Sequence, residues 1–350
     1  MGKINIGING FGRIGRLVTR SIMAYHKDDI NIVGVNDLMD AETLAYLFKR
    51  DSVHGTYPGE VSHTDNSITI DGMEIGISAE KDPANLKWDE RGADFIVEST
   101  GLFRTKEAAS KHLEAGAEKV VISAPAKGDG DVKTVVLGVN EEIIDDSARI
   151  YSNASCTTNC LAPMVKVLND SFGLEKGFMT TTHAYTGSQN ILDGPHKDPR
   201  RGRTAAQNLV PTTTGAAQAV ELVLPELEGK LDGSAIRVPV PDGSLTDLTA
   251  VLSEDVTVEQ VDQAFKDAAN GAMKGVLGYS EEELVSTDIL GDPHSCIYDS
   301  GFTKANGNLV KILAWYDNEA GYSARTVDLI KKIAEILLLP VGSLNVIPLG

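Results

Sequence analysis

The feature that most constrains the fold is the glycine pattern Gly10-Phe-Gly12-Arg-Ile-Gly15, which stands between a strand-like segment and a helix-like one. Residues 3–9 read as a short buried strand, and residues 16–26 have helical composition without Gly or Pro. Glycines in this context permit a tight turn and a close backbone approach, and the start of the helix offers free N–H groups to a pyrophosphate. The spacing alone is a weak signal, because a structural glycine turn also explains it.

A second feature that supports a dinucleotide site is Asp37, which follows a strand-like run over residues 30–36. An acid at this position accepts hydrogen bonds from the adenosine ribose hydroxyls and repels a 2′-phosphate, so it favours NAD over NADP. Taken alone, Asp37 also fits a turn-capping residue after a strand. The glycines, the strand and the acid together predict a dinucleotide-binding domain with NAD as its cofactor.

Strand-like and helix-like segments alternate up to about residue 150, which predicts a mostly parallel sheet covered on both faces. Beyond that point the strand-like alternations become longer. The expected strands of the first part lie at 95–97, 120–122 and 135–137, with a helix at 106–115. In the second part we expect strands at 178–184, 234–240 and 248–251 and helices at 216–224, 258–270 and 323–338, the last of them amphipathic and able to return to the first domain.

Composition narrows the class of protein. A chain of 350 residues is long enough for about two domains, and 42% hydrophobic residues is typical of a globular protein. The net charge of −18 argues against a general role in binding nucleic acid or an anionic membrane. The longest apolar run near the C-terminus, residues 336–339, cannot span a bilayer, and the N-terminus shows no signal region, so we expect a cytoplasmic protein.

Three cysteines are too few for a disulfide framework, and the odd count leaves at least one thiol free. Cys156 stands near the start of a helical run, where the helix dipole is expected to lower its pKa from about 8.5 toward neutrality. Pro163 indicates that this helix is kinked or starts late, and the sequence leaves both open. Cys160 and Cys296 are interpreted as packing residues, and we expect no metal, since zinc needs ligands that the sequence does not gather.

A reactive thiolate needs a base, and His183 ends a strand-like run in the segment T-T-T-H-A-Y-T. The other six histidines lie in segments with no comparable partner. A lone histidine is more often structural, and a lone cysteine is more often buried and inert. The interpretation of Cys156 and His183 as a catalytic pair therefore depends on the dinucleotide motif. A long Gly-, Pro- and Arg-rich segment follows at 183–207, and loops of that length tend to be functional. Its Arg200, Arg201 and Arg203 suit a dianionic substrate, although a solvated loop also explains them.

At this point the residues identify a family. The chain resembles phosphorylating glyceraldehyde-3-phosphate dehydrogenase over nearly its whole length, through six motifs in the correct order. They are I-N-G-F-G-R-I-G-R at 8–16, S-N-A-S-C-T-T-N-C-L-A-P at 152–163, H-A-Y-T at 183–186, P-T-T-T-G-A-A at 211–217, R-V-P-V-P at 237–241 and W-Y-D-N-E-A-G-Y-S at 315–323.

The resemblance implies an α/β Rossmann domain over 1–154, completed by a C-terminal helix over 319–338, and an α+β catalytic domain with a mixed sheet over 155–318. The tail at 339–350 has no functional account. Cys156 is implied to attack the aldehyde of D-glyceraldehyde 3-phosphate, and His183 to take the proton as hydride leaves for NAD. Inorganic phosphate then releases the thioester as 1,3-bisphosphoglycerate. The implied assembly is a homotetramer in which the 183–207 loop packs on a neighbouring subunit.

The resemblance also implies roles for further residues, position by position. The cofactor contacts implied are Gly10, Gly12, Arg13, Ile14, Gly15, Asp37, Lys81, Ser123 and Asn318, with Asn318 fixing the nicotinamide carboxamide. Thr186 and Arg237 resemble the pair that holds the substrate phosphate. The site of the attacking phosphate would comprise Ser155, Thr157, Thr214 and Gly215, with Arg201 shared nearby. Two positions depart from the family pattern: Gly194 stands where many NAD-specific members have Leu, and Lys81 stands where Arg is usual.

Two alternatives remain at this stage. An NAD-dependent erythrose-4-phosphate dehydrogenase would share the fold and the nucleophile but release its thioester to water; the P-T-T-T-G segment favours phosphate instead. A non-catalytic NAD-binding protein would have no use for an activated thiol, so intact Cys156, His183 and Arg237 weigh against it.

Overall fold

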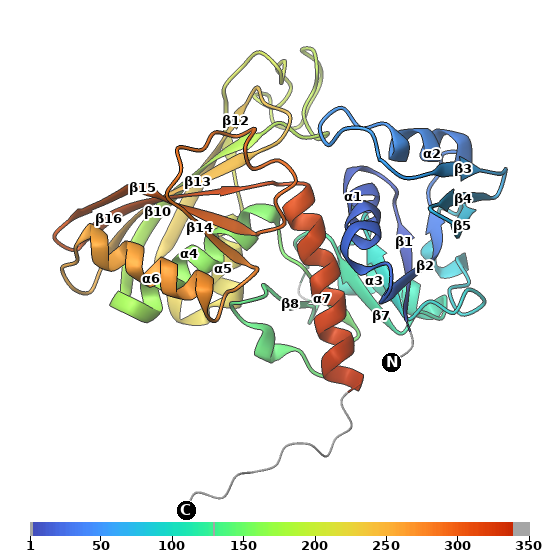
Figure 1. Cartoon of the computed structure of the whole chain (residues 1–350), viewed down its shortest axis with the longest axis horizontal. Helices are drawn as coiled ribbons and strands as arrows, with labels where there is room; N and C mark the ends of the chain where they lie inside the picture. The colour runs from blue at the N-terminus through green and yellow to red at the C-terminus, as the bar shows by residue number, and fades with distance from the viewer. Residues whose placement is uncertain (1–2, 129, 339–350) are drawn as a thin grey trace, which may run out of the picture.

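Within residues 3–128 and 130–338, which the computed structural model describes, the first part of the chain forms a nine-stranded sheet (Figure 1). Its strand order is β3-β4-β5-β2-β1-β6-β7-β9-β8. The strands are β1 (Ile4–Asn9), β2 (Ile30–Asn36), β3 (Val61–His63), β4 (Ser67–Ile70), β5 (Met73–Ser78), β6 (Phe95–Glu98), β7 (Lys119–Ile122), β8 (Lys133–Thr134) and β9 (Ile150–Ser152).

The centre of this sheet is parallel, as the alternation of strands and helices predicts, and only the β3–β4–β5 edge is antiparallel. β1 lies between β2 and β6, so successive crossovers leave it in opposite directions. The connecting helices are α1 (Arg13–Ser21), α2 (Ala41–Lys49) and α3 (Lys106–Glu114), with short helical turns η1 (Ile22–His26), η2 (Pro83–Asn85) and η3 (Glu141–Ile143). The Rossmann arrangement expected for the first domain is confirmed.

The strand expected at 135–137 is wrong. β8 ends at Thr134, and the chain then turns, with Asn140 Oδ1 accepting the Val136 N–H at 2.8 Å and Gly138 at a φ of +78°. Val135 still donates its N–H to the Ser152 carbonyl of β9 at 2.9 Å, but no strand continues beyond it, and Val135 and Val136 are fully buried, so the apolar run reflects core packing more than strand pairing.

The second part of the chain forms a seven-stranded mixed sheet of order β11-β12-β10-β13-β16-β15-β14 within the described residues. β10 pairs in parallel with β12 and antiparallel with β13, which confirms the expected mixed sheet. The strands are β10 (Leu174–Ala184), β11 (Val210–Thr213), β12 (Leu231–Val238), β13 (Ser244–Leu252), β14 (Leu277–Ser280), β15 (Cys296–Asn306) and β16 (Leu309–Tyr316); the helices are α4 (Cys156–Phe172), α5 (Ala216–Val223), η4 (Pro225–Leu227) and α6 (Val258–Asn270).

Helix α4 settles the alternatives that Pro163 left open. It begins at Cys156, with Ser155 as its N-cap, and continues through Pro163 to Phe172, so the proline does not delay its start. Residues 157–165 are all buried. The helix therefore holds Cys156 at its first turn on a rigid element of the second core.

The last helix, α7 (Ala320–Leu338), returns to the first sheet and begins three residues earlier than expected. It runs beside α1 along the boundary between the two sheets (Figure 1). Its buried Val327, Ile330 and Ile333 belong to the hydrophobic core of the first sheet. Asp317 Oδ1 caps its start by accepting the N–H groups of Glu319 and Ala320 at 2.8 and 2.7 Å.

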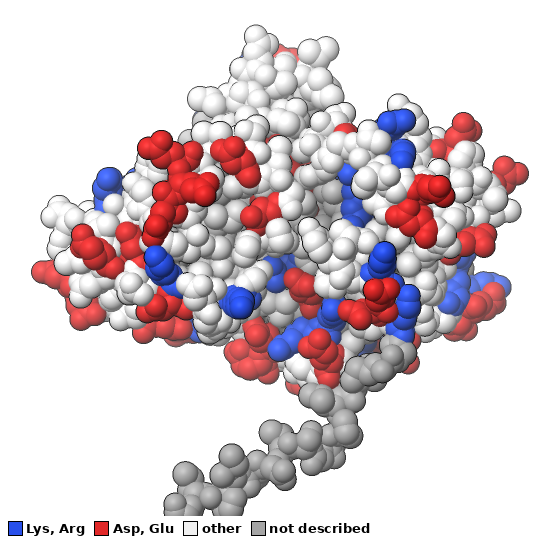
Figure 2. All heavy atoms as spheres, viewed as in Figure 1, with Lys and Arg blue, Asp and Glu red and all other residues white. Residues whose placement is uncertain are grey.

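None of the helices in the described residues has the length and apolarity that crossing a membrane requires. Acidic side chains are spread over the face shown in Figure 2, with basic ones between them. The segment 185–209, between β10 and β11, extends away from the second sheet at the top of Figure 1. The tail expected at 339–350 lies outside the described residues, apart from its boundary with α7.

Candidate active site

Several predicted cofactor residues lie at one edge of the first sheet. Gly10 follows β1, Asp37 follows β2 and Ser123 follows β7, and these strands are parallel, so their carboxyl ends meet at the same edge. Ligands of open α/β sheets bind in the crevice at the point where the crossovers diverge, which is at β1 here. Asp37 also closes the turn, because its Oδ2 accepts the Phe11 N–H at 2.8 Å.

The glycine loop shows why its residues are glycine. Gly10 has a φ of +93°, and a Cβ there would lie 2.7 Å from the Thr100 backbone nitrogen. A Cβ on Gly15 would lie 2.1 Å from the Gly10 carbonyl oxygen, so α1 could not pack against the loop. At Gly12, the N-cap of α1, nothing lies within 4 Å of the Cβ position. A helix start with open space in front of it fits a dinucleotide phosphate.

The remaining cofactor candidates lie around this loop. Arg13 is the first residue of α1, and its guanidinium forms ion pairs with Asp51 and Glu319. Ile14 is half-buried against the first core, and Lys81 is exposed in the bend after β5. Ser123 donates its hydroxyl to the Glu98 carbonyl at 3.1 Å, which attaches the end of β7 to β6.

Cys156 and His183 meet at the second sheet. Sγ of Cys156, half-buried at the start of α4, lies 3.5 Å from Nε2 of His183, which is 4% exposed near the end of β10. Nδ1 of His183 lies 2.7 Å from the Ala184 carbonyl oxygen. When Nδ1 donates to that carbonyl, the lone pair of Nε2 faces the thiol, which is the form that a general base requires.

Arg237 lies directly beside the histidine. β10 and β12 place the two residues in register, and Arg237 Nη1 donates to the Ala184 carbonyl at 2.9 Å and lies 2.8 Å from His183 Nδ1. Because a guanidinium only donates, Nδ1 accepts from Arg237 in the tautomer with the ring hydrogen on Nε2, whereas the tautomer with Nδ1–H donates to the Ala184 carbonyl. Burial, and then the positive charges of Arg237 and Arg201, lower the pKa of His183 to about 3. The imidazole is therefore neutral at physiological pH and able to accept a proton. Arg237 Nε is buried without a hydrogen-bond partner among the described residues.

The expected lowering of the thiol pKa is wrong. Burial raises the pKa of Cys156 to about 11, which outweighs the lowering by Arg237 and by the contacts with Thr157 at the helix start. Cys156 and His183 thus rest as a neutral thiol and a neutral imidazole in contact. The thiol has to lose its proton during attack, and Nε2 is the group beside it that can take this proton.

The residues predicted to bind the attacking phosphate lie on three segments. Ser155 caps α4, and its Oγ accepts the Thr158 N–H at 3.0 Å. Thr157 is buried, with its hydroxyl bonded to Tyr316. Thr214 and Gly215 precede α5, and nothing lies within 4 Å of the Cβ position at Gly215. Arg201 donates to Thr212 Oγ1 at 3.0 Å, in β11 just before this helix start.

The structure shows how the arginines, Thr186 and Gly194 of the 185–209 segment are placed. Arg203 is exposed and pairs with Asp193 at 2.8 Å, so of the three arginines it is Arg201 whose charge reaches His183 and Arg237. Thr186 Oγ1 lies 2.9 Å from Ser188 Oγ. At Gly194, which departs from the family pattern, a Cβ would lie 2.9 Å from the Asn190 side chain.

Sequence reasoning missed Tyr316, although it stands in the W-Y-D-N-E segment. Its hydroxyl lies 2.9 Å from Thr157 Oγ1 and 2.8 Å from Thr181 Oγ1, and its ring packs edge-on to the His183 ring at a centroid distance of 6.0 Å. One buried phenol thus joins the helix that carries Cys156 to the strand that carries His183.

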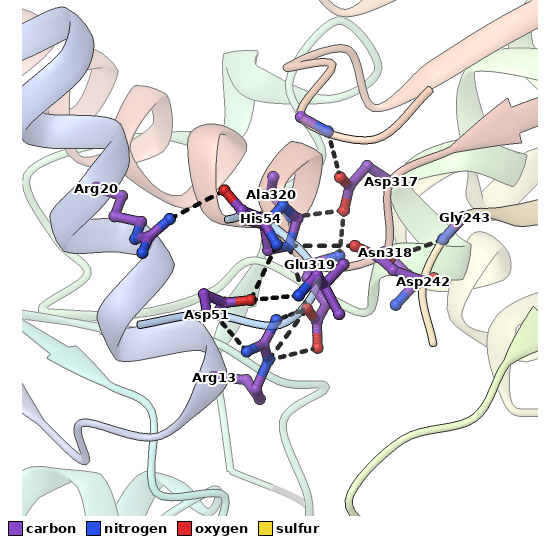
Figure 3. A network of polar contacts seen from close by, with 12 residues as sticks. Arg13, Arg20, Asp51, His54, Asp242, Gly243, Asp317, Asn318, Glu319 and Ala320 are labelled. Atoms are coloured by element: carbon purple, nitrogen blue, oxygen red, sulfur yellow. Dashed lines mark hydrogen bonds and ion pairs between the residues drawn. The ribbon is translucent and has the colours of Figure 1, made fainter. Parts of the chain in front are cut away.

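Sequence reasoning also missed an ionic network between the two sheets (Figure 3). Nε2 of His54 lies 3.2 Å from carboxylate oxygens of both Asp242 and Glu319, and Glu319 also binds Arg13. Burial alone lowers the pKa of His54, but Asp242, Glu319 and Asp317 together raise it to about 9. The prediction that His183 alone had a partner was therefore wrong for His54, whose partners lie far away in the sequence.

This network is better described as ion pairs than as a metal site. Ligand atoms of His54, Asp242 and Asp317 lie within 4.8 Å of one another. Both oxygens of Asp317 already accept backbone N–H groups, from Gly291 at 2.7 Å and from the start of α7. Burial and the neighbouring Asp242 raise the pKa of Asp317 to about 7.

Comparison with known proteins agrees with this geometry. Residues 4–106 match the family described as glyceraldehyde 3-phosphate dehydrogenase, NAD binding domain, and residues 155–318 match its C-terminal domain. The chain is 56% identical over 333 residues to glyceraldehyde-3-phosphate dehydrogenases of Priestia megaterium and Geobacillus stearothermophilus, covering 95% of this chain and 98% of each relative. It is 52% identical over 339 residues to that of Mycobacterium leprae, covering 95% and 99%.

Proposed function

Because the chain belongs to the glyceraldehyde-3-phosphate dehydrogenase family, we propose that it catalyses the NAD-dependent oxidation and phosphorylation of D-glyceraldehyde 3-phosphate to 1,3-bisphosphoglycerate. The observation that carries the proposal is the 3.5 Å contact between Cys156 Sγ and His183 Nε2, with Arg237 beside the base. A thiol, a neutral imidazole and a guanidinium supply the nucleophile, the base and the anion-binding group that a phosphorylated aldehyde requires.

In the first step, Sγ of Cys156 attacks the aldehyde carbon, and Nε2 of His183 transfers the thiol proton to the carbonyl oxygen to give a hemithioacetal. Nε2 then takes the hydroxyl proton as the hemithioacetal is oxidised to a thioester. NAD, when bound, accepts the hydride. The low pKa of His183 keeps the imidazole neutral, and Nε2 accepts the proton in the tautomer in which Nδ1 carries the ring hydrogen.

In the second step, an oxygen of inorganic phosphate attacks the thioester carbon, and Cys156 leaves as a thiolate that recovers its proton from His183. We assign Thr186 and Arg237 to the phosphate group of the substrate. The buried, unpartnered Nε of Arg237 supports this, because an anion would satisfy it. We assign the attacking phosphate to the residues at the starts of α4 and α5, namely Ser155, Thr157, Thr214 and Gly215, with Arg201 beside them.

NAD fits the edge of the first sheet. We propose that Gly10, Gly12 and Gly15 let the pyrophosphate approach the start of α1, beside Arg13 and Ile14. Asp37 would bind the adenosine ribose, and Asn318 the carboxamide; Lys81 and Ser123 complete the proposed contacts. We accordingly assign residues 1–154 and 319–338 to the NAD-binding domain and 155–318 to the catalytic domain.

The test is a steady-state assay of NADH formation. We expect D-glyceraldehyde 3-phosphate to be oxidised rapidly only in the presence of inorganic phosphate. Efficient oxidation of erythrose 4-phosphate without any effect of phosphate would overturn the proposal in favour of hydrolytic release of the thioester. No NADH with either aldehyde, from a protein that still binds NAD, would identify a non-catalytic binder.

For assembly, we propose a homotetramer of four 37.3 kDa chains acting in the cytoplasm. The support is the 185–209 segment, in which Ile191, Leu192 and Leu209 are 79%, 75% and 68% exposed. Large apolar side chains clustered on an extended segment are typical of surfaces that another subunit covers. Light scattering tests this: a fully active monomer would show that the segment needs no neighbouring subunit.

A further inference from the structure

Ser244 connects the catalytic base strand to the proposed nicotinamide anchor through one hydroxyl group. It is the first residue of β13 and is fully buried. Its Oγ accepts the N–H of Ala184, the residue after His183, at 3.1 Å and donates to Asn318 Oδ1 at 2.5 Å. No role follows for Ser244 from the motifs in the sequence or from the proposed chemistry.

The contact determines which way the amide of Asn318 faces. A serine hydroxyl has one hydrogen to donate, and Oγ of Ser244 donates it to Oδ1 of Asn318 while accepting the Ala184 N–H. Oδ1 of Asn318 is the acceptor, which leaves Nδ2 as the free group. Among the described residues, Nδ2 has no hydrogen-bond partner, and the side chain is 5% exposed.

The neighbours of Asn318 fix its backbone but not its amide. Asp317 caps α7 and binds the Gly291 N–H, and Glu319 binds Arg13 and His54. These contacts hold the chain on both sides of Asn318. Rotation of the amide about its last bond is restrained by the hydrogen bond from Ser244.

We propose that Ser244 is a positioning residue, which turns the Asn318 amide so that its NH₂ group alone is offered to the cofactor and binds the carbonyl oxygen of the carboxamide. This inference rests on the proposed contact between Asn318 and the carboxamide. An amide free to rotate would offer either an acceptor or a donor, and it would bind a rotated carboxamide through that group's own NH₂ instead.

The test compares equilibrium binding of two cofactors to the ligand-free enzyme by calorimetry. One is NAD, and the other is its 3-acetylpyridine analogue, which keeps the carbonyl oxygen but has a methyl group in place of the NH₂. Ser244→Ala should weaken NAD binding roughly tenfold, because the Asn318 amide is no longer held in its binding orientation before the cofactor arrives. It should weaken binding of the analogue several-fold further, because a rotated Asn318 oxygen finds no donor on the methyl group.

Thr246→Val is the matched control. Thr246 is the next residue along β13 on the same face, is equally buried, and its hydroxyl has no hydrogen-bond partner among the described residues. Its replacement should leave both dissociation constants within about twofold of the unchanged protein, because no hydrogen bond is lost. Thermal unfolding of each ligand-free variant verifies that the fold is retained.

Asn318→Ala separates the two proposals. If it leaves NAD binding unchanged, the proposed contact between Asn318 and the carboxamide is wrong. If it weakens binding while Ser244→Ala behaves like Thr246→Val, only the role of Ser244 is wrong. We expect the double variant to bind both cofactors as Asn318→Ala does. Additive losses, equal for NAD and the analogue, would overturn the inference by showing that Ser244 acts on the fold and not through Asn318.

Discussion

Sγ of Cys156 lies 3.5 Å from Nε2 of His183, although 27 residues separate them in the sequence. Helix α4 and strand β10 hold the two side chains, and Tyr316 bonds to a threonine on each element. Because the pKa of the buried thiol is raised to about 11 and that of the imidazole is lowered to about 3, the pair is neutral at rest. In the proposed mechanism, catalysis therefore depends on proton transfer within the pair.

We expect Cys156→Ser to remove nearly all dehydrogenase activity, because a hydroxyl is a far weaker nucleophile than a thiol in this position. NAD affinity and thermal stability should remain, since the substitution is small. Iodoacetate should modify Cys156 with a stoichiometry of one and abolish activity in parallel. Cys296→Ser, at a buried position in the core, is the control and should keep its activity. Inactivation by iodoacetate through modification of Cys160 or Cys296 would contradict the assignment of Cys156 as the nucleophile.

His183→Asn should slow hydride transfer by roughly 10²–10⁴-fold in single-turnover experiments, because it removes the base next to the thiol. It should also slow the alkylation of Cys156 at neutral pH. His63→Asn, at an exposed position in β3, should have no effect on either rate. An unchanged single-turnover rate in His183→Asn would show that another group takes the proton.

For cofactor choice, Asp37→Ala should narrow the preference for NAD over NADP by removing repulsion of the 2′-phosphate. The structure adds a second effect: Asp37 accepts the Phe11 N–H, so its loss should also loosen the glycine loop and reduce NAD affinity. The measurement is kcat/KM with each cofactor, with exposed Asp65→Ala as the control. Equal efficiency with NAD and NADP in the unchanged enzyme would refute the reading of Asp37.

Tyr316→Phe should lower the free energy of unfolding by about 1–3 kcal/mol, because it leaves the buried hydroxyls of Thr157 and Thr181 without their partner. The alkylation rate of Cys156 should fall with it, since α4 and β10 lose the bond that sets their spacing. Tyr25→Phe, whose side chain is 64% exposed, is the control for a lost phenol hydroxyl. Unchanged stability and an unchanged alkylation rate would mean that packing alone fixes the positions of Cys156 and His183.

His54→Gln should change how stability depends on pH. The pKa of His54 is raised from 6.5 to about 9 in the folded protein, so its contribution is fully present below pH 6.5 and is lost as the pH rises to about 9. The difference in melting temperature between the unchanged protein and His54→Gln should therefore be largest below pH 6.5 and shrink above it. A difference that stays constant across this range would mean that folding does not raise the pKa of His54.

Local patterns predicted much of the candidate site. The glycines at residues 10, 12 and 15, the acid at Asp37 and the position of Cys156 at a helix start follow from turn geometry and helix capping, which act over a few residues. The two-domain α/β architecture follows from the alternation of strands and helices. The expected strand at 135–137 was wrong because a buried turn that follows a short strand produces the same apolar pattern as a strand.

The sequence by itself thus determined the class of fold and predicted the NAD site, the nucleophile and its base, because the patterns that mark them follow short-range backbone and side-chain rules. The tertiary structure alone decided the protonation of the catalytic pair, since burial and the charge of Arg237 set both pKa values. It also decided the partners of Ser244, Tyr316 and His54. These hydrogen bonds and ion pairs join segments from both parts of the chain, and such contacts exist only after the two sheets and α7 have packed together.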